Sequence, residues 1–224
     1  MEISRVGVIG AGQMGNGIAH VFALAGYDVA LNDISEDALS AAMDIIQSNL
    51  DRQVSRGKVT AEDAAAARDR IRPELDLAAI GPSDLIIEAA TEREPLKNEI
   101  FARLAPYLAP HTLLTSNTSS IPIMSLAVQT GRASQVCGLH FFNPVPVLDL
   151  VELVPSLATS EETLGRLESF ASDVLGKSVI RARDRAGFIV NALLVPYLLS
   201  AIRMAESGFA TVEHIDAGMV KGCN

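Results

Sequence analysis

Apolar positions at the start of the chain change from strand-like to helix-like spacing and back again. A short β-branched run at Val6–Gly10 ends in glycines, and residues 13–25 then carry apolar side chains at helical spacing. Gly26 closes this helix, and residues 27–32 form a second apolar run. The pattern predicts a βαβ unit over residues 3–33, with parallel strands and a right-handed crossover.

The next segment, from Ser35 to Arg70, is rich in alanine and in charged residues and has helical periodicity. The pattern breaks at residues 56–58 and restarts at Thr60, with acidic residues in the following turn. This pattern predicts a long helical hairpin. Because the hairpin is longer than a simple crossover needs, we expect it to project from the sheet and to serve a ligand or a neighbour.

Strand and helix patterns continue to alternate along the chain. Strands are predicted at residues 85–89, 112–115, 136–141, 148–154 and 179–181, and helices at residues 96–108, 123–127 and 161–175. The alternation predicts an α/β fold: a Rossmann-type, doubly wound, mostly parallel sheet with the helical hairpin as an insertion, over residues 1–183. Residues 184–224 are predicted to begin an all-helical C-terminal domain.

Residues 189–205 are almost entirely apolar. They include Asn191, Pro196 and Arg203, and they fall short of the roughly 20 residues of a membrane span. A helix that is apolar all round is usually buried. We therefore expect this helix to lie in a domain or subunit interface.

Composition narrows the function classes. The chain has 224 residues and a formal net charge of -9, which argues against broad attraction to nucleic acid or to an anionic membrane. The N-terminus has no signal-peptide pattern, and Cys137 and Cys223 lack metal-ligand spacing. We expect a cytoplasmic protein that acts on small molecules, with no metal and no nucleic-acid or membrane partner.

The segment Gly10–Gly15 matches the pattern G-x-G-x-x-G between a predicted strand and a predicted helix. Here the first glycine allows a tight turn, the second lets the backbone approach a pyrophosphate, and the third lets the helix pack on the strand. The helix N-terminus adds a partial positive charge for phosphate. A glycine turn without a ligand is the alternative. The predicted contacts to a dinucleotide are Gly10, Gly12, Gln13, Met14 and Gly15.

Asp33 ends the second predicted strand, close to the spacing of about 20 residues at which a carboxylate binds the adenosine ribose. A carboxylate there disfavours the 2′-phosphate of NADP, and residues 34–37 contain no arginine that would bind it. The cofactor is therefore predicted to be NAD, with NADP less favoured. A solvated Asp33 without a ligand is the alternative.

Longer characteristic strings follow. Residues 116–121 read Ser-Asn-Thr-Ser-Ser-Ile, residues 138–147 read Gly-Leu-His-Phe-Phe-Asn-Pro-Val-Pro-Val, and residues 150–152 read Leu-Val-Glu. Together with the glycine segment and residues 88–92, 97–99, 187–191 and 194–197, they resemble the 3-hydroxyacyl-CoA dehydrogenase family over essentially the whole chain. The short-chain 3-hydroxybutyryl-CoA dehydrogenases look closest. The resemblance implies reversible, NAD-dependent oxidation of a (3S)-3-hydroxyacyl-CoA of short chain to the 3-ketoacyl-CoA, and a homodimer formed through the C-terminal helices.

Oxidation of a secondary alcohol needs a base for the hydroxyl proton, and histidine titrates near neutral pH. His140 is the candidate base. Glu152, on the next predicted strand, would accept a bond from its second ring nitrogen and stabilise the imidazolium. The resemblance implies that this pair is catalytic. Without it, His140 would more often be structural and Glu152 a solvated strand residue.

The resemblance assigns roles to further polar residues. Ser119 would bond the reacting oxygen and help to seat the nicotinamide, and Asn191 would orient the substrate. The alternatives are a helix cap at Ser119 and a buried amide at Asn191. Without the resemblance, Glu92 and Lys97 would be interpreted as a surface ion pair at a helix terminus. The family's cofactor-side contacts fall on Glu92, Lys97, Asn117 and Asn143, of which Asn143 is also expected near the substrate.

The predicted hairpin carries a basic face. Arg52 and Arg56 lie at i, i+4 spacing with Lys58 near, and could hold the phosphates of coenzyme A. A solvated face is equally compatible with the pattern.

Two departures from the family pattern stand out. Ala186 and Ala192 occupy positions where the family commonly has Pro and Arg, and relatives continue past Asn224 with helices that complete the acyl-CoA pocket. We therefore expect a shortened C-terminal domain.

A non-catalytic, NAD-binding or crystallin-like structural protein of the same fold is the main alternative function, against which the intact candidate residues argue. A dehydrogenase of a free hydroxy acid or sugar acid is another, and contact of the hairpin with coenzyme A would exclude it.

Overall fold

The computed structural model describes residues 3–223 of the chain. The strands are β1 (Arg5–Ile9), β2 (Asp28–Asn32), β3 (Ile71–Glu74), β4 (Leu85–Glu88), β5 (Leu113–Ser116), β6 (Val136–Phe141), β7 (Leu150–Pro155) and β8 (Ser178–Arg181). The α-helices are α1 (Gln13–Leu24), α2 (Glu36–Ser55), α3 (Ala61–Arg70), α4 (Glu94–Leu104), α5 (Ile123–Ala127), α6 (Glu161–Ser169), α7 (Val190–Glu206) and α8 (Val212–Gly222).

The described strands form one sheet in the order β3-β2-β1-β4-β5-β6-β7-β8. Neighbouring strands are parallel except β6 and β7, which are antiparallel. The order reverses between β1 and β4, so the chain leaves the carboxyl ends of these two strands in opposite directions and a crevice opens between them. The predicted doubly wound, mostly parallel sheet is confirmed.

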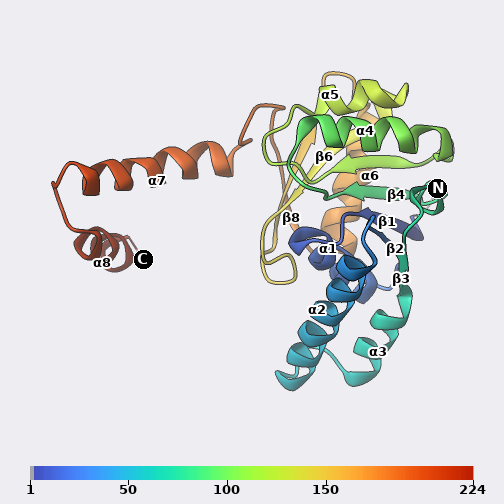
Figure 1. The fold of residues 1–224 in the computed structure, drawn as a ribbon, viewed down its shortest axis with the longest axis horizontal. Helices are drawn as coiled ribbons and strands as arrows, with labels where there is room; N and C mark the ends of the chain where they lie inside the picture. The colour runs from blue at the N-terminus through green and yellow to red at the C-terminus, as the bar shows by residue number, and fades with distance from the viewer. Residues whose placement is uncertain (1–2, 224) are drawn as a thin grey trace.

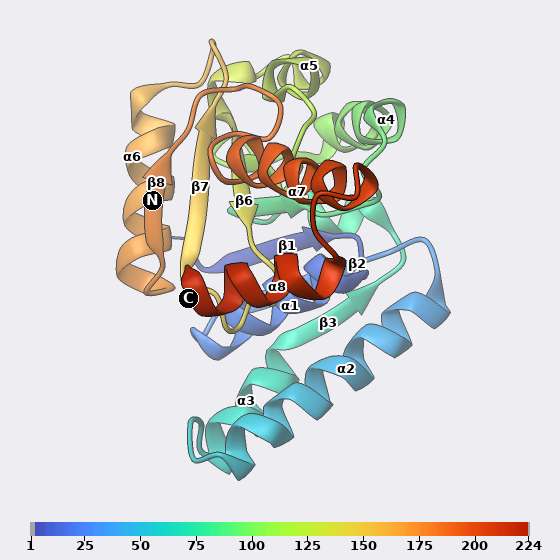
Figure 2. The ribbon, with the colours of Figure 1, turned by 90° about the vertical axis from the view of Figure 1, so that its left-hand side faces the viewer.

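Side chains of the strands alternate between two cores, one on each face of the sheet. Val8, Ile87 and Leu139 belong to the first core, which α1, α2, α3 and α6 cover. Ile86 and Leu114 belong to the second, which α4 and α5 cover. Helices on both faces explain why the strands read as continuous apolar runs (Figures 1 and 2).

The helices α2 and α3 form the predicted hairpin, which projects beyond the sheet (Figure 1). The side chain of Ser35 caps α2 by accepting a bond from the amide of Ala38 at 3.2 Å. Thr60 caps α3 in the same way, through the amide of Asp63 at 3.0 Å. Gly57 has a φ of +65° in the connection, a conformation that favours glycine.

Some elements differ from the sequence-based expectations. Strand β3 was not anticipated, because it contains Pro73 and lies at the sheet edge with half of its positions exposed. The helix expected over 96–108 begins earlier and ends at Leu104, where a 3-10 turn containing Pro106 follows. The bounds of α8 were not predicted, but α7 and α8 confirm the expected helical C-terminal domain.

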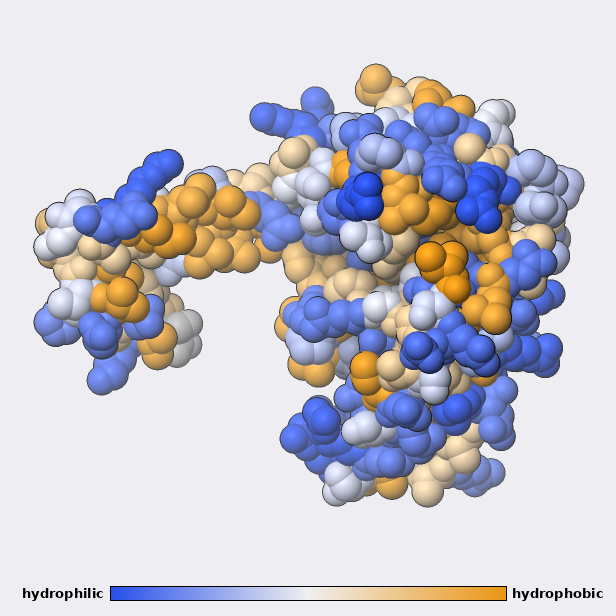
Figure 3. Space-filling view, viewed as in Figure 1, coloured by the Kyte–Doolittle hydropathy of each residue, from blue (hydrophilic) through white to orange (hydrophobic). Residues whose placement is uncertain are grey.

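Helices α7 and α8 extend away from the body of the molecule as an arm (Figure 1). Neither contains a buried residue, and large apolar side chains are exposed along α7, including Leu193 at 71 % and Ile202 at 52 % (Figure 3). Within the described residues no other part of the fold covers α7, so the expectation that it lies in a domain or subunit interface stays a prediction. None of the helices within residues 3–223 has the length and apolarity needed to cross a membrane.

Candidate active site

The glycine segment forms the turn between β1 and α1. Gly10 has a φ of +98°, and a Cβ there would lie 2.7 Å from the carbonyl oxygen of Ala89. A Cβ on Gly15 would lie 1.7 Å from the carbonyl oxygen of Gly10, so α1 packs directly on the turn. A Cβ on Gly12, in contrast, would meet nothing within 4 Å. Packing explains Gly10 and Gly15, and the open space at Gly12 fits the approach of a pyrophosphate to the helix N-terminus.

This contrast gives a first testable prediction. We expect Gly12→Ala to leave the melting temperature of the protein unchanged, because the new methyl group meets no protein atom. It should weaken NADH binding at least about tenfold, because the methyl group occupies the space that the pyrophosphate needs. Calorimetric titration with NADH measures the affinity, and unchanged affinity would contradict a dinucleotide at this turn.

Asp33 stands at the end of β2 beside the glycine turn. Its Oδ2 accepts a bond from the amide of Ala11 at 2.9 Å, and its Oδ1 accepts one from the amide of Ser35 at 3.0 Å. The carboxylate therefore fixes the turn and the start of α2 relative to each other. It is partly exposed, so it remains accessible to a ligand.

His140 and Glu152 are direct cross-strand partners in the antiparallel pair β6–β7. His140 Nδ1 lies 2.8 Å from Glu152 Oε2, and the two residues are 6 % and 0 % exposed. A carboxylate can only accept a hydrogen bond, so this contact selects the tautomer in which Nδ1 is the donor and Nε2 is the acceptor. The other oxygen, Oε1, accepts bonds from the amides of Ile189 and Val190, each at 3.0 Å. Glu152 thus joins the histidine to the N-terminus of α7.

Two phenylalanine rings flank the imidazole of His140. The ring of Phe142 lies 4.6 Å from it, and the ring of Phe188 lies 5.5 Å away in an edge-to-face arrangement. Phe188 has a φ of +46°, a conformation that is costly for a residue with a bulky side chain. Such strain concentrates at functional sites, where surrounding contacts hold it in place.

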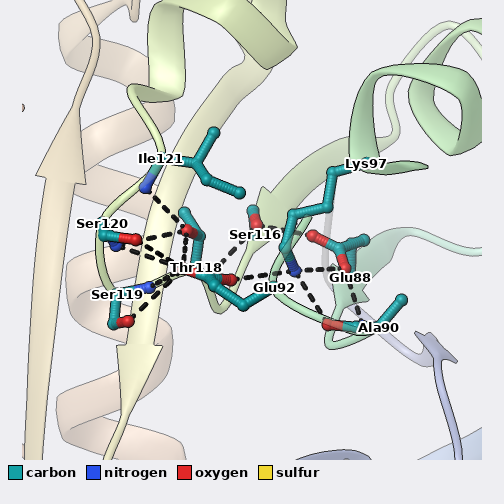
Figure 4. Close-up of polar contacts among 9 residues, drawn as sticks. All are labelled: Glu88, Ala90, Glu92, Lys97, Ser116, Thr118, Ser119, Ser120 and Ile121. Atoms are coloured by element: carbon teal, nitrogen blue, oxygen red, sulfur yellow. Dashed lines mark hydrogen bonds and ion pairs between the residues drawn. The ribbon is translucent and has the colours of Figure 1, made fainter. Parts of the chain in front are cut away.

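Glu92 organises the loop after β5. Its Oε1 accepts bonds from Thr118 Oγ1 at 2.6 Å, from the Ser119 amide at 2.9 Å and from Ser120 Oγ at 3.1 Å (Figure 4). Burial opposes ionisation of Glu92, but the bond from Thr118, the charge of Lys97 and the remaining bonds outweigh it and lower its pKa. Glu92 therefore holds Ser119 in place as a carboxylate.

Lys97 is 1 % exposed, so the alternative of a surface pair with Glu92 is wrong. Its Nζ lies 2.6 Å from Glu88 Oε1 and 3.4 Å from Glu92 Oε2 (Figure 4). The fully buried Glu88 also accepts bonds from Ser116 Oγ at 2.6 Å and from the Ala90 amide at 2.7 Å. This network joins the carboxyl ends of β4 and β5 to α4.

Most of the expected residues line two neighbouring hollows at the carboxyl edge of the sheet, whereas Gly10, Gly15 and Asp33 line neither. A cleft of about 320 Å³ brings together Met14, Glu92, Lys97, Asn117, Ser119, His140, Asn143 and Asn191. A second hollow, of about 690 Å³, contains Gly12 and Gln13 and shares Asn143 with the first. Glu152 lies behind His140.

The carboxylate of Asp184 caps α5, because it accepts hydrogen bonds from the amides of Ile123 and Met124. The alternative role of Ser119 as the cap of this helix is therefore wrong.

Arg52 and Arg56 lie outside the first cleft. Together with Lys58 they line a groove of about 180 Å³ between the hairpin and the loop after β6. Arg52 also borders the hollow at the glycine turn, so the groove continues toward the cleft.

Sequence reasoning did not single out Glu88, Phe142 or Phe188 as site residues. The signal for Glu88 was a carboxylate at the end of an entirely apolar strand, Leu85–Glu88, where a charge must be paired. For the phenylalanines no chemical signal exists, because only the fold places them against His140.

Known proteins resemble this chain over its whole length. The model of the NAD-binding domain of 3-hydroxyacyl-CoA dehydrogenase matches residues 5–185, and that of the C-terminal domain matches residues 187–224. A 3-hydroxybutyryl-CoA dehydrogenase of Mycobacterium tuberculosis is 53% identical over 221 residues, which is 98% of this chain and 77% of that protein. One from Bradyrhizobium diazoefficiens is 46% identical over 99% of this chain and 75% of its own length.

Solved structures agree. The crystal structure of (S)-3-hydroxybutyryl-CoA dehydrogenase PaaH1 from Ralstonia eutropha superposes with a TM-score of 0.94 at 41% identity, and covers 100% of this chain and 78% of that one. The fold, the glycine turn and these matches lead to one conclusion. The chain belongs to the 3-hydroxyacyl-CoA dehydrogenase family.

Proposed function

We propose that this protein catalyses the reversible, NAD-dependent oxidation of (3S)-3-hydroxybutyryl-CoA, or a similar short-chain 3-hydroxyacyl-CoA, to the 3-ketoacyl-CoA. The observation that carries the proposal is the buried His140–Glu152 pair at one wall of a cleft next to the glycine turn. Relatives named 3-hydroxybutyryl-CoA dehydrogenase support the substrate class. They favour an enzyme over a non-catalytic structural protein of the same fold.

In the proposed reaction, His140 Nε2 takes the proton of the 3-hydroxyl group. When bound, NAD supplies the oxidising power, since hydride leaves C3 of the substrate for the nicotinamide ring. Glu152 holds the tautomer through its bond to Nδ1 and stabilises the imidazolium that forms. In the reverse direction His140 returns the proton to the carbonyl oxygen.

We assign the remaining roles to residues of the same cleft. Ser119, held by Glu92, would donate to the reacting oxygen, and Asn191 at the start of α7 would orient the acyl group. The proposed cofactor contacts in the cleft and the adjoining hollow are Gly12, Gln13, Met14, Glu92, Lys97, Asn117, Ser119 and Asn143, of which Ser119 and Asn143 would also touch the substrate. Gly10, Gly15 and Asp33, which lie at the glycine turn, complete the proposed set of cofactor contacts.

NAD is the proposed cofactor rather than NADP. Asp33 presents a carboxylate beside the glycine turn, where a 2′-phosphate would meet a like charge. The groove lined by Arg52, Arg56 and Lys58 is proposed to hold the phosphates of coenzyme A.

Further proposals concern the whole molecule. The exposed apolar side chains of α7 support a homodimer formed through the C-terminal helices. We also propose a domain boundary near residue 183 and a location in the cytoplasm.

The substrate class can be tested by following NADH absorbance with the purified chain. We expect NADH to be consumed with acetoacetyl-CoA and not with free acetoacetate. Only acetoacetyl-CoA carries the coenzyme A phosphates that are proposed to bind in the groove at Arg52 and Arg56. NADPH should react at least about tenfold more slowly, because of Asp33. Equal rates with free acetoacetate would contradict the coenzyme A assignment.

A further inference from the structure

Lys177 carries a buried ammonium group whose described hydrogen bonds both go to one loop of the chain. It lies before β8 and is 8 % exposed. Its Nζ donates to the carbonyl oxygens of Val145 at 2.9 Å and Leu148 at 2.7 Å. Burial lowers the pKa of this ammonium group, and the carboxylate of Asp149 opposes the shift. Burial of an ammonium group is costly unless hydrogen bonds compensate for the lost water, and here the two carbonyl oxygens supply them.

The loop that Lys177 binds, residues 143–149, lies between β6 and β7. The amides of Val147 and Leu148 both donate to the carbonyl oxygen of Pro144, which closes the loop into a tight turn. Val145 is also buried against α1, where a Cβ on Gly17 would lie only 3.1 Å from Val145 Cβ. The loop is therefore held by two contacts, one with α1 and one with Lys177.

The outer face of the same loop forms one wall of the grooves described above. Pro144, Pro146 and Val147 line the groove opposite Arg52 and Arg56. Pro144 and Pro146 also line the larger hollow at the glycine turn. The width of both grooves thus depends on where this loop is held.

His140 is held independently of Lys177. The β6–β7 ladder pairs His140 with Glu152 and Phe141 with Val151, before the loop begins. The amide of Phe141 also donates to Asn117 Oδ1 at 2.8 Å. Movement of the loop would change the grooves and leave the catalytic pair in place.

We propose that Lys177 is a positioning residue for coenzyme A recognition, which fixes the wall formed by residues 143–149 opposite the basic face of the hairpin. The inference deepens the proposed function and rests on it. Lys177 touches neither substrate nor cofactor. It acts through the two carbonyl groups that it binds.

The test is Lys177→Met, which keeps an unbranched side chain one heavy atom shorter than that of lysine and removes its donors. Hydrogen exchange should become faster at the amides of Val147 and Leu148, because two loop carbonyls lose their partner. Calorimetric titration should show about tenfold weaker binding of coenzyme A itself, and a smaller loss of NADH affinity, because the same loop also lines the hollow at the glycine turn. In turnover, KM for acetoacetyl-CoA should rise while kcat stays within about twofold, because His140 does not move.

Arg132→Met is the matched control. The guanidinium group of Arg132 donates to the carbonyl oxygens of Ala109 and Pro110, in a loop that precedes β5 at the opposite end of the sheet. This change should lower stability without altering coenzyme A binding. Pro146→Gly provides a second variant that loosens the same wall and keeps Lys177, and it should also weaken coenzyme A binding.

The outcomes test the role of Lys177 separately from the proposed function. Unchanged loop exchange and unchanged coenzyme A affinity in Lys177→Met would overturn the role of Lys177. An equal loss of coenzyme A affinity in Arg132→Met would overturn it too, since it would show a general loss of stability. If the wild-type chain neither binds coenzyme A nor reduces acetoacetyl-CoA, the proposed function fails, and exchange at Val147 and Leu148 still decides whether Lys177 fixes the loop.

Discussion

His140→Ala should lower kcat for acetoacetyl-CoA reduction by about a thousandfold, within the range that a general acid or base contributes. The imidazole is the proposed proton carrier, and its Nδ1 is already bonded to Glu152 at 2.8 Å. Alanine leaves the reacting oxygen without a proton donor. The affinity for NADH should stay the same, because the glycine turn and Asp33 are not in contact with the ring. Steady-state NADH absorbance and calorimetry measure the two quantities.

His111→Ala is the matched control for this prediction. His111 is also paired with a carboxylate, since its Nε2 lies 2.9 Å from Asp84 Oδ1, but it lies before β5 at the opposite end of the sheet. Its loss should leave kcat within about twofold. A His140→Ala variant with near wild-type kcat would remove His140 from the mechanism.

The second large effect is expected on stability, at the buried pair of Lys97 and Glu88. Lys97→Met leaves the carboxylate of Glu88, which is 0 % exposed, without its cation. Breaking a buried ion pair from one side costs about 3–5 kcal/mol of unfolding free energy. Urea unfolding should therefore show a much lower midpoint with a similar slope.

Two further variants identify the cause. Adding Glu88→Gln to Lys97→Met should recover a large part of the loss, because no buried charge remains. Arg103→Met breaks the pair of Arg103 with Glu99, which are 62 % and 61 % exposed, and should cost about 0.5 kcal/mol or less. Equal losses of unfolding free energy in Lys97→Met and Arg103→Met would contradict this account. They would show that the buried pair of Lys97 and Glu88 stabilises the protein no more than an exposed pair does.

Much of the fold was predictable because it rests on local rules. The strand at Val6–Gly10, the glycine turn and the hairpin follow from β-branched runs, glycines and capping residues close together in the sequence. Strand β3 was missed because an edge strand with Pro73 lacks an apolar run. The exposure of α7 could not be foreseen, since an apolar sequence shows that a helix needs a partner and not whether its own chain provides one.

The candidate site was predictable only in part. The glycine pattern and the family resemblance pointed to residues of the cleft, and strand register explains why Glu152 faces His140. The Glu88–Lys97 pair was not foreseen, because surface spacing rules say nothing about burial at a strand end. Lys177 carried no signal either. Its role depends on a loop 29 to 32 positions away in the chain, which only the tertiary fold brings to it.

The most direct test of the central claim is to follow the hydride itself. The purified chain is incubated with acetoacetyl-CoA and NADH that carries deuterium at C4 of the nicotinamide, on each face in turn, and the product is analysed by mass spectrometry. We predict 3-hydroxybutyryl-CoA with one deuterium at C3 from one of the two labelled forms, and no product with His140→Ala on the same time scale. Acetoacetyl-CoA recovered unreduced from a wild-type chain that binds both ligands would contradict the proposed dehydrogenase.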